Sequence, residues 1–150
     1  NQRAMEMLLE IAKGGNRKAH VTTTLEARKR IMGFGHRVYK TMDPRAAYLK
    51  DVVCEMDEEA EDPRWCSLAL ETVETVGAKK GIYPNVDFFT APLLYTLGIP
   101  LDLFTPIFAI SRIAGWIAHV LEQYDDNRLI RPKSRYVGPT ERSYTPIAER

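Results

Sequence analysis

Residues 103–124 read LFTPIFAISRIAGWIAHVLEQY, and this stretch is the strongest indication of the fold class. Written on a helix, it places apolar side chains on most faces, which is typical of a helix buried in protein. No stretch of convincing length alternates apolar and polar residues as a strand does. The sequence therefore predicts an all-α protein in which this long helix is deeply buried.

Shorter helical patterns precede this stretch, each bounded by glycine, proline or a capping residue. Asp43 and Pro44 form a good helix start, because Asp can cap a helix and Pro fits its first turn. An acidic run at residues 57–62 is interpreted as a solvated helix end. After residue 125 the periodicity is lost, and an irregular tail is expected. The predicted helical and apolar segments are residues 4–12, 22–30, 44–56, 63–80 and 88–97.

The composition is that of an ordinary globular protein, with 45% hydrophobic residues, 27% charged residues and a net charge of +1. This balance gives no electrostatic footprint for nucleic acid or a membrane surface. No stretch of about 18 uninterrupted apolar residues is present, so no membrane-spanning segment is expected. Cys54 and Cys66 belong to no metal-binding pattern, and we expect free buried thiols in a reducing compartment and no metal site.

The glycine-rich stretch GFGHRVYK, residues 33–40, is the first candidate for chemistry. Glycines beside a histidine let the backbone approach a ligand closely. His36 is suited to polarising a carbonyl or moving a proton near neutral pH. The basic residues around it, with Lys29 and Arg30, are suited to phosphates. On spacing alone, an exposed polar loop with a surface histidine is favoured about two to one.

Three further charged residues each have a plain interpretation beside a functional one. Arg45, at a helix start, can form a bidentate pair of hydrogen bonds with a carboxylate, or it can lie on the surface. Asp87, before two phenylalanines, is either a helix cap or a base held against an apolar wall. Arg112, inside the most apolar helix, needs an anionic partner, which is either an internal carboxylate or a substrate.

Five motifs, taken together and in this order, resemble a known protein family, although each motif alone is a weak signal. They are GFGHRVYK (33–40), DPRA (43–46), PNVDFF (84–89), LFTPIFAISRIAGW (103–116) and EQYDDNRLIRPKS (122–134). Together they resemble the citrate synthase family over the whole chain, in its short, bacterial-type form. The resemblance implies the all-helical citrate synthase fold, with the small CoA-binding domain at residues 1–100. Residues 101–150 would be the last helix and tail of the large domain.

The resemblance also implies the reaction, in which acetyl-CoA condenses with oxaloacetate and water to give citrate and CoA. It assigns Asp87 as the base and His36 as the hydrogen-bond donor to the ketone. No cofactor or metal is implied, and the complete protein would be a cytoplasmic homodimer that binds neither nucleic acid nor membrane. The residues implied to bind substrate are Arg45, Phe108, Arg112 and Arg131, the last reaching the partner subunit's site, and those implied to contact CoA are Arg30, Ile31, Met32, Gly33, Phe34, Gly35, Lys40 and Asn85.

The chain departs from the family pattern at its start. The family has a second catalytic histidine, which would lie four residues before Asn1, and most of the large domain also precedes this point. We therefore expect a C-terminal fragment that is inactive alone. Two alternatives stay open: a 2-methylcitrate synthase that uses propionyl-CoA, and a non-catalytic CoA-binding or dimerisation fragment.

Overall fold

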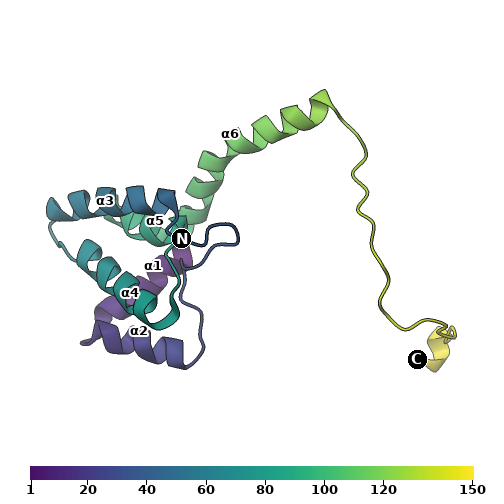
Figure 1. Ribbon diagram of the computed structural model, residues 1–150, viewed down its shortest axis with the longest axis horizontal. Coiled ribbons are helices and arrows are strands. Elements are labelled where there is room, and N and C mark those ends of the chain that lie inside the picture. Colours follow the sequence, from purple (N-terminus) through teal and green to yellow (C-terminus); the bar gives the residue numbers. More distant parts are fainter. The chain divides into compact units, whose positions relative to one another are not determined.

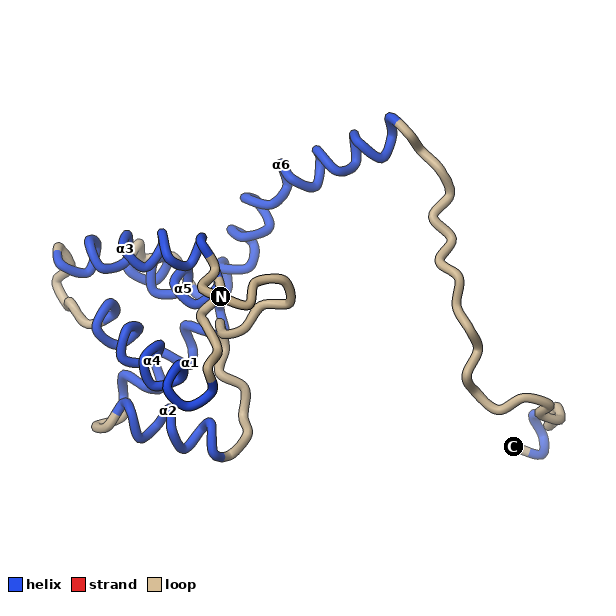
Figure 2. The backbone as a smooth tube through the Cα atoms, viewed as in Figure 1, coloured by secondary structure: helices blue, strands red, loops and turns tan.

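The computed structural model describes residues 1–150, and its regular structure is entirely helical (Figures 1 and 2). The chain divides into two compact units, Asn1–Ala114 and Gly115–Arg150. A single β-bridge between Phe34 and Pro84 is the only strand-like pairing. The predicted all-α class is confirmed. The boundary expected near residue 100 concerns the complete protein and stays a prediction.

The first unit contains five helices and the start of a sixth. Four N-termini are capped by side chains of Asn1, Asn16, Asp43 and Asn85, each of which accepts a hydrogen bond from the first turn of its helix. The helix expected at 22–30 is shifted, because Asn16 caps it early and it ends before the left-handed residue Arg28. The elements are α1 (Gln2–Lys13), α2 (Arg17–Glu26), α3 (Pro44–Glu58), α4 (Trp65–Lys80), α5 (Val86–Thr96), the 3-10 turn η1 (Leu101–Leu103) and α6 (Phe104–Asp125).

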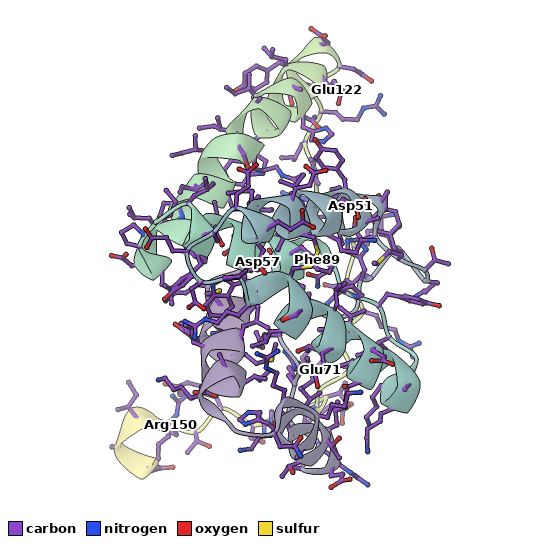
Figure 3. All side chains as sticks on the ribbon, turned by 90° about the vertical axis from the view of Figure 1, so that its left-hand side faces the viewer. Asp51, Asp57, Glu71, Phe89, Glu122 and Arg150 are labelled. Atoms are coloured by element: carbon purple, nitrogen blue, oxygen red, sulfur yellow. A yellow bond between two sulfur atoms is a disulfide. The ribbon has the colours of Figure 1, made fainter.

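Helices α3 and α5 pack along each other, as do α2 and α4, while α1 contacts α2, α4 and α5 (Figure 1). Phe88 and Phe89 of α5 are fully buried, and Figure 3 labels Phe89 in the interior of this unit. Burying such rings stabilises the fold by roughly 1.5–3 kcal/mol each. Helix α5 is therefore the central element, and its first turn is held firmly by the core beneath it.

The acidic run at 57–62 is not simply a solvated helix end. Asp57 is 5% exposed, and its carboxylate accepts hydrogen bonds from the backbone N–H groups of Arg64, Trp65 and Cys66. It therefore caps α4 from the end of α3, a contact that Figure 3 places where the two helices meet. The sequence suggested a solvated helix end because the backbone groups that bind the Asp57 carboxylate belong to the next helix.

The expectation of free thiols is wrong. Cys54 of α3 and Cys66 of α4 form a disulfide, with their Cα atoms 4.9 Å apart, and no free cysteine remains. The connection between α3 and α4 turns back on itself, which brings residues twelve apart in sequence together. Sequence spacing alone does not reveal this, because both cysteines fall in helical patterns.

Helix α6 is not buried within this chain, contrary to the expectation for residues 103–124. Phe104 is its only buried residue, and Trp116 and Ile117 are each 54% exposed. The stretch Leu101–Asp125 is long and apolar enough to cross a membrane by length and composition, a test that core helices of soluble proteins also pass. Beyond it, the tail is irregular as expected, apart from the short turn η2 (Ile147–Glu149).

Candidate active site

The glycine loop before His36 lies directly against the start of α5. Gly33 has φ +80°, and a Cβ atom added there would lie 2.8 Å from the Cα and Cβ atoms of Phe88. The ring of Phe34 meets that of Phe88 edge to face, with centroids 4.7 Å apart. Only glycine fits this close approach, so the sequence of the loop fixes its position on α5.

Residues 33–35 and 83–85 are joined by a short ladder. The Gly35 N–H donates to the Tyr83 carbonyl at 2.8 Å, and the Asn85 N–H donates to the Gly33 carbonyl at 2.9 Å. The Asn85 side-chain amide adds a bond from Nδ2 to the Gly35 carbonyl at 2.9 Å. These contacts join the His36 loop to the helix that carries Asp87.

His36 is held by its own loop. Its Nδ1 atom accepts hydrogen bonds from the backbone N–H groups of Val38 and Tyr39, each at 3.1 Å. A nitrogen that accepts carries no proton, so a neutral His36 has its proton on Nε2. The imidazole is thereby prepared to donate one hydrogen bond from Nε2 to a ligand oxygen.

Asp87 lies in the first turn of α5, where the helix dipole favours its negative charge. Its backbone N–H donates to Asn85 Oδ1 at 3.0 Å, and its carboxylate is 43% exposed. The backbone nitrogen of Asn1 lies 3.5 Å from Asp87 Oδ1. The carboxylate is thus accessible and adjoins the start of α1.

Arg45 is oriented by Asp43. Its Nε and Nη2 atoms donate to the two carboxylate oxygens at 3.1 and 2.8 Å, and Asp43 is 1% exposed. The hydrogen bond from the Arg45 guanidinium lowers the pKa of Asp43, and the same bond raises the pKa of Arg45. The Nη1 hydrogens of Arg45 have no partner in the chain, which leaves them available to a ligand carboxylate.

Two clefts meet at the loop. The larger, about 470 Å³, contains Asp87 together with six of the residues expected to contact CoA: Arg30, Ile31, Met32, Gly33, Phe34 and Asn85. The smaller, about 220 Å³, contains His36 with the other two, Gly35 and Lys40. The chain therefore brings all eight into two depressions on either side of one loop.

The larger cleft is also lined by two cations that are not among the eight residues implied to contact CoA. Lys29 and Lys80 line it beside Arg30, so three positive side chains surround one depression. Lys29 stands next to Arg30 in sequence and was part of the basic cluster noted above. Lys80 lies at the end of a distant helix, and no local pattern connects it with the loop.

The remaining candidates lie on or beyond α6. Phe108 and Arg112 stand one turn apart, with the guanidinium carbon of Arg112 5.7 Å from the centre of the Phe108 ring. Neither lines the two clefts. Arg131 belongs to the irregular segment of the second unit. No group of three or more His, Cys, Asp or Glu side chains is placed to hold a metal ion.

The fold and the two clefts define an all-helical domain whose cations are suited to an anionic ligand. A family model described as "Citrate synthase, C-terminal domain" matches residues 1–133. The chain therefore belongs to the citrate synthase family.

Named relatives agree with this assignment. Over 150 residues the chain is 46% identical to citrate synthase 2 of Bacillus subtilis, and over 130 residues it is 51% identical to the citrate synthase of Haloferax volcanii. These matches cover 100% and 87% of the chain but only 40% and 34% of the relatives. A 2-methylcitrate synthase of Corynebacterium glutamicum is 39% identical over the whole chain and 39% of its own length.

A solved structure gives the same fold. The citrate synthase of Thermoplasma acidophilum, in its ternary complex with carboxymethyl coenzyme A and oxaloacetate, matches with a TM-score of 0.81 at 39% identity. The match covers 99% of this chain and 41% of that one. The chain thus corresponds to well under half of each relative.

Proposed function

We propose that the complete protein containing these residues is a citrate synthase, which condenses acetyl-CoA with oxaloacetate and water to give citrate and CoA. The observation that carries the proposal is that the loop before His36 is hydrogen-bonded to the start of the helix that carries Asp87, and that Asp87 lines a cleft with three cations. The Thermoplasma acidophilum relative binds a CoA analogue and oxaloacetate in its ternary complex.

Asp87 is proposed as the base that removes a methyl proton from the thioester. Its exposed carboxylate stands where a ligand in the larger cleft can reach it. The backbone nitrogen of Asn1 lies beside that carboxylate, so residues that precede Asn1 in a longer chain would lie close to it. This is consistent with the family's second histidine, four residues earlier, acting on the same thioester.

His36 is proposed to donate its Nε2 proton as a hydrogen bond to the oxaloacetate ketone, which stabilises the alkoxide formed when the new carbon–carbon bond is made. Arg45, held at one edge by Asp43, would bind a substrate carboxylate through Nη1. Phe108, Arg112 and Arg131 complete the proposed substrate set. For Arg131 the site would be that of a partner subunit in a homodimer.

The cations of the larger cleft, Lys29, Arg30 and Lys80, are proposed to attract the phosphates of CoA. No cofactor or metal is proposed, because positioned hydrogen bonds can stabilise the developing charge. We place the protein in the cytoplasm, although the disulfide removes the argument that free thiols gave for a reducing compartment.

Propionyl-CoA is the alternative thioester, and the 2-methylcitrate synthase relative favours keeping it open. One methylene is worth about 1–3 kcal/mol in a pocket, so a real preference should appear as a kcat/KM ratio of about 10-fold or more. Measuring both thioesters on the complete protein separates the two. For the 150-residue chain alone, CoA binding without turnover in a calorimetric titration would support the non-catalytic alternative.

The decisive test is the substitution Asp87→Asn in the complete protein. We expect thiol release from acetyl-CoA and oxaloacetate to fall by about 10²–10⁴-fold, because a general base contributes that much. Asp51→Asn is the matched control, since this exposed aspartate on α3 pairs only with Lys50 (Figure 3). Equal turnover in the two variants would refute the assignment of the base.

A further inference from the structure

We propose that Asn85 is a positioning residue that sets the placement of His36 relative to Asp87, rather than a residue whose main role is to contact CoA. This inference rests on the function proposed above. It starts from the position of Asn85 between the two elements that carry the catalytic groups.

The side chain of Asn85 contacts both elements at once. Its Nδ2 atom donates to the Gly35 carbonyl at 2.9 Å, and its Oδ1 atom accepts from the Asp87 backbone N–H at 3.0 Å. Gly35 directly precedes His36. One planar amide therefore joins Gly35, the residue before the proposed hydrogen-bond donor His36, to Asp87, the proposed base. Asn85 and Gly35 are 50 residues apart in sequence.

The backbone of Asn85 reinforces the same connection. Its N–H donates to the Gly33 carbonyl at 2.9 Å, and its carbonyl accepts from the Phe88 N–H at 3.2 Å. The side-chain oxygen, one side-chain N–H and both backbone groups are thus used inside the chain. Little hydrogen-bonding capacity remains for a ligand, although Asn85 lines the larger cleft.

The His36 loop needs such a restraint. Gly33 and Gly35 both have positive φ, at +80° and +81°, and glycines reach many other conformations at little cost. The core fixes Gly33 against Phe88, whereas a Cβ atom added at Gly35 would meet nothing within 4 Å. The bond from Asn85 and the backbone bond to Tyr83 are what hold the second glycine. A misplacement of about 1 Å at a catalytic group can lower a rate by about 10²-fold.

Asn85→Ser tests the idea in the complete protein. Serine keeps a good N-cap for α5 but cannot reach the Gly35 carbonyl. We expect kcat to fall by about 10–100-fold with less than about a threefold change in the KM for acetyl-CoA. Asn16→Ser is the matched control, because Asn16 caps the exposed start of α2 and has no second bond.

Asn85→Asp is the second variant, and it guards against misfolding. Aspartate is nearly isosteric and caps α5 equally well, but its carboxylate cannot donate to the Gly35 carbonyl and adds a negative charge near Asp87. A double-mutant cycle with His36→Gln adds a readout that a purely structural role would not change. We expect Asn85→Ser to lower kcat only slightly further once His36 is absent.

The outcomes separate this inference from the proposed function. If Asn85→Ser raises the KM for acetyl-CoA and leaves kcat unchanged, Asn85 is a CoA contact and the proposal is wrong. It is equally wrong if both Asn85 variants match Asn16→Ser, or if the losses from Asn85→Ser and His36→Gln simply add. Asp87→Asn, measured in parallel, reports on the reaction itself: its loss of activity together with normal Asn85 variants would overturn only the positioning role.

Discussion

The region around the glycine loop and the region of α6 use their side chains in opposite ways. Around the loop, Asn85, Asp43 and the backbone of residues 33–35 form hydrogen bonds within the chain, and the rings beneath are fully buried. On α6, the apolar residues Ile113, Trp116 and Ile117 are more than half exposed. The first region is organised by its own sequence, whereas the second has an apolar surface suited to contact with further protein.

Introducing a negative charge on α6 tests whether its apolar surface contacts further protein, and it should have the largest effect of these predictions. In the complete protein, Trp116→Asp should abolish the native assembly, because a buried carboxylate without a partner is very costly. Sedimentation would give the mass, and circular dichroism the helix content. Tyr48→Asp on α3, where the tyrosine is 72% exposed, is the control and should change neither. Normal assembly of the Trp116 variant would mean that α6 faces solvent in the complete protein as well.

Gly33→Ala tests the opposite region. The added Cβ would lie 2.8 Å from backbone and side-chain atoms of Phe88, in addition to the cost of a positive φ. We expect a loss of about 3 kcal/mol in unfolding free energy, from overpacking and strain together. Gly98→Ala is the control for backbone strain alone, because Gly98 has φ +74° and nothing within 4 Å, and it should cost about 1 kcal/mol. Equal losses in denaturant titrations would show that the contact with Phe88 is not tight.

The same division explains what the sequence could predict. The helix start at Asp43 and Pro44 follows from local capping rules, and it is present. The disulfide and the cap that Asp57 gives to α4 depend on how α3 meets α4, which no local pattern encodes. Helix α6 was expected to be buried because its apolar faces were evident, but burial also requires neighbouring residues, and within α6 only Phe104 is buried.

The residues of the candidate site also fall into two groups, those that the sequence selected and those that it missed. The five motifs were enough to select most of the candidate residues that line the two clefts, although Asn85 and Asp87 lie about 50 residues from the loop in sequence. Lys80 was missed because it reaches the cleft from the end of α4. The double role of Asn85 could not be predicted either, because its partner Gly35 is 50 residues away.

The smallest effect is expected at the ion pair that orients Arg45. Asp43→Asn keeps the cap on α3 but removes the negative charge. It should lower the free energy of unfolding by about 1 kcal/mol, since Arg45 is partly exposed to solvent. The pKa of Asp43 is lowered in the folded protein, so its contribution is complete above the unfolded value of about 3.9. It is lost as the pH falls through the folded value. The stability gap between wild type and variant, measured by denaturant titration, should therefore be constant from pH 7 to pH 5 and close below pH 4. A gap that widens towards low pH would contradict the assignment to this carboxylate.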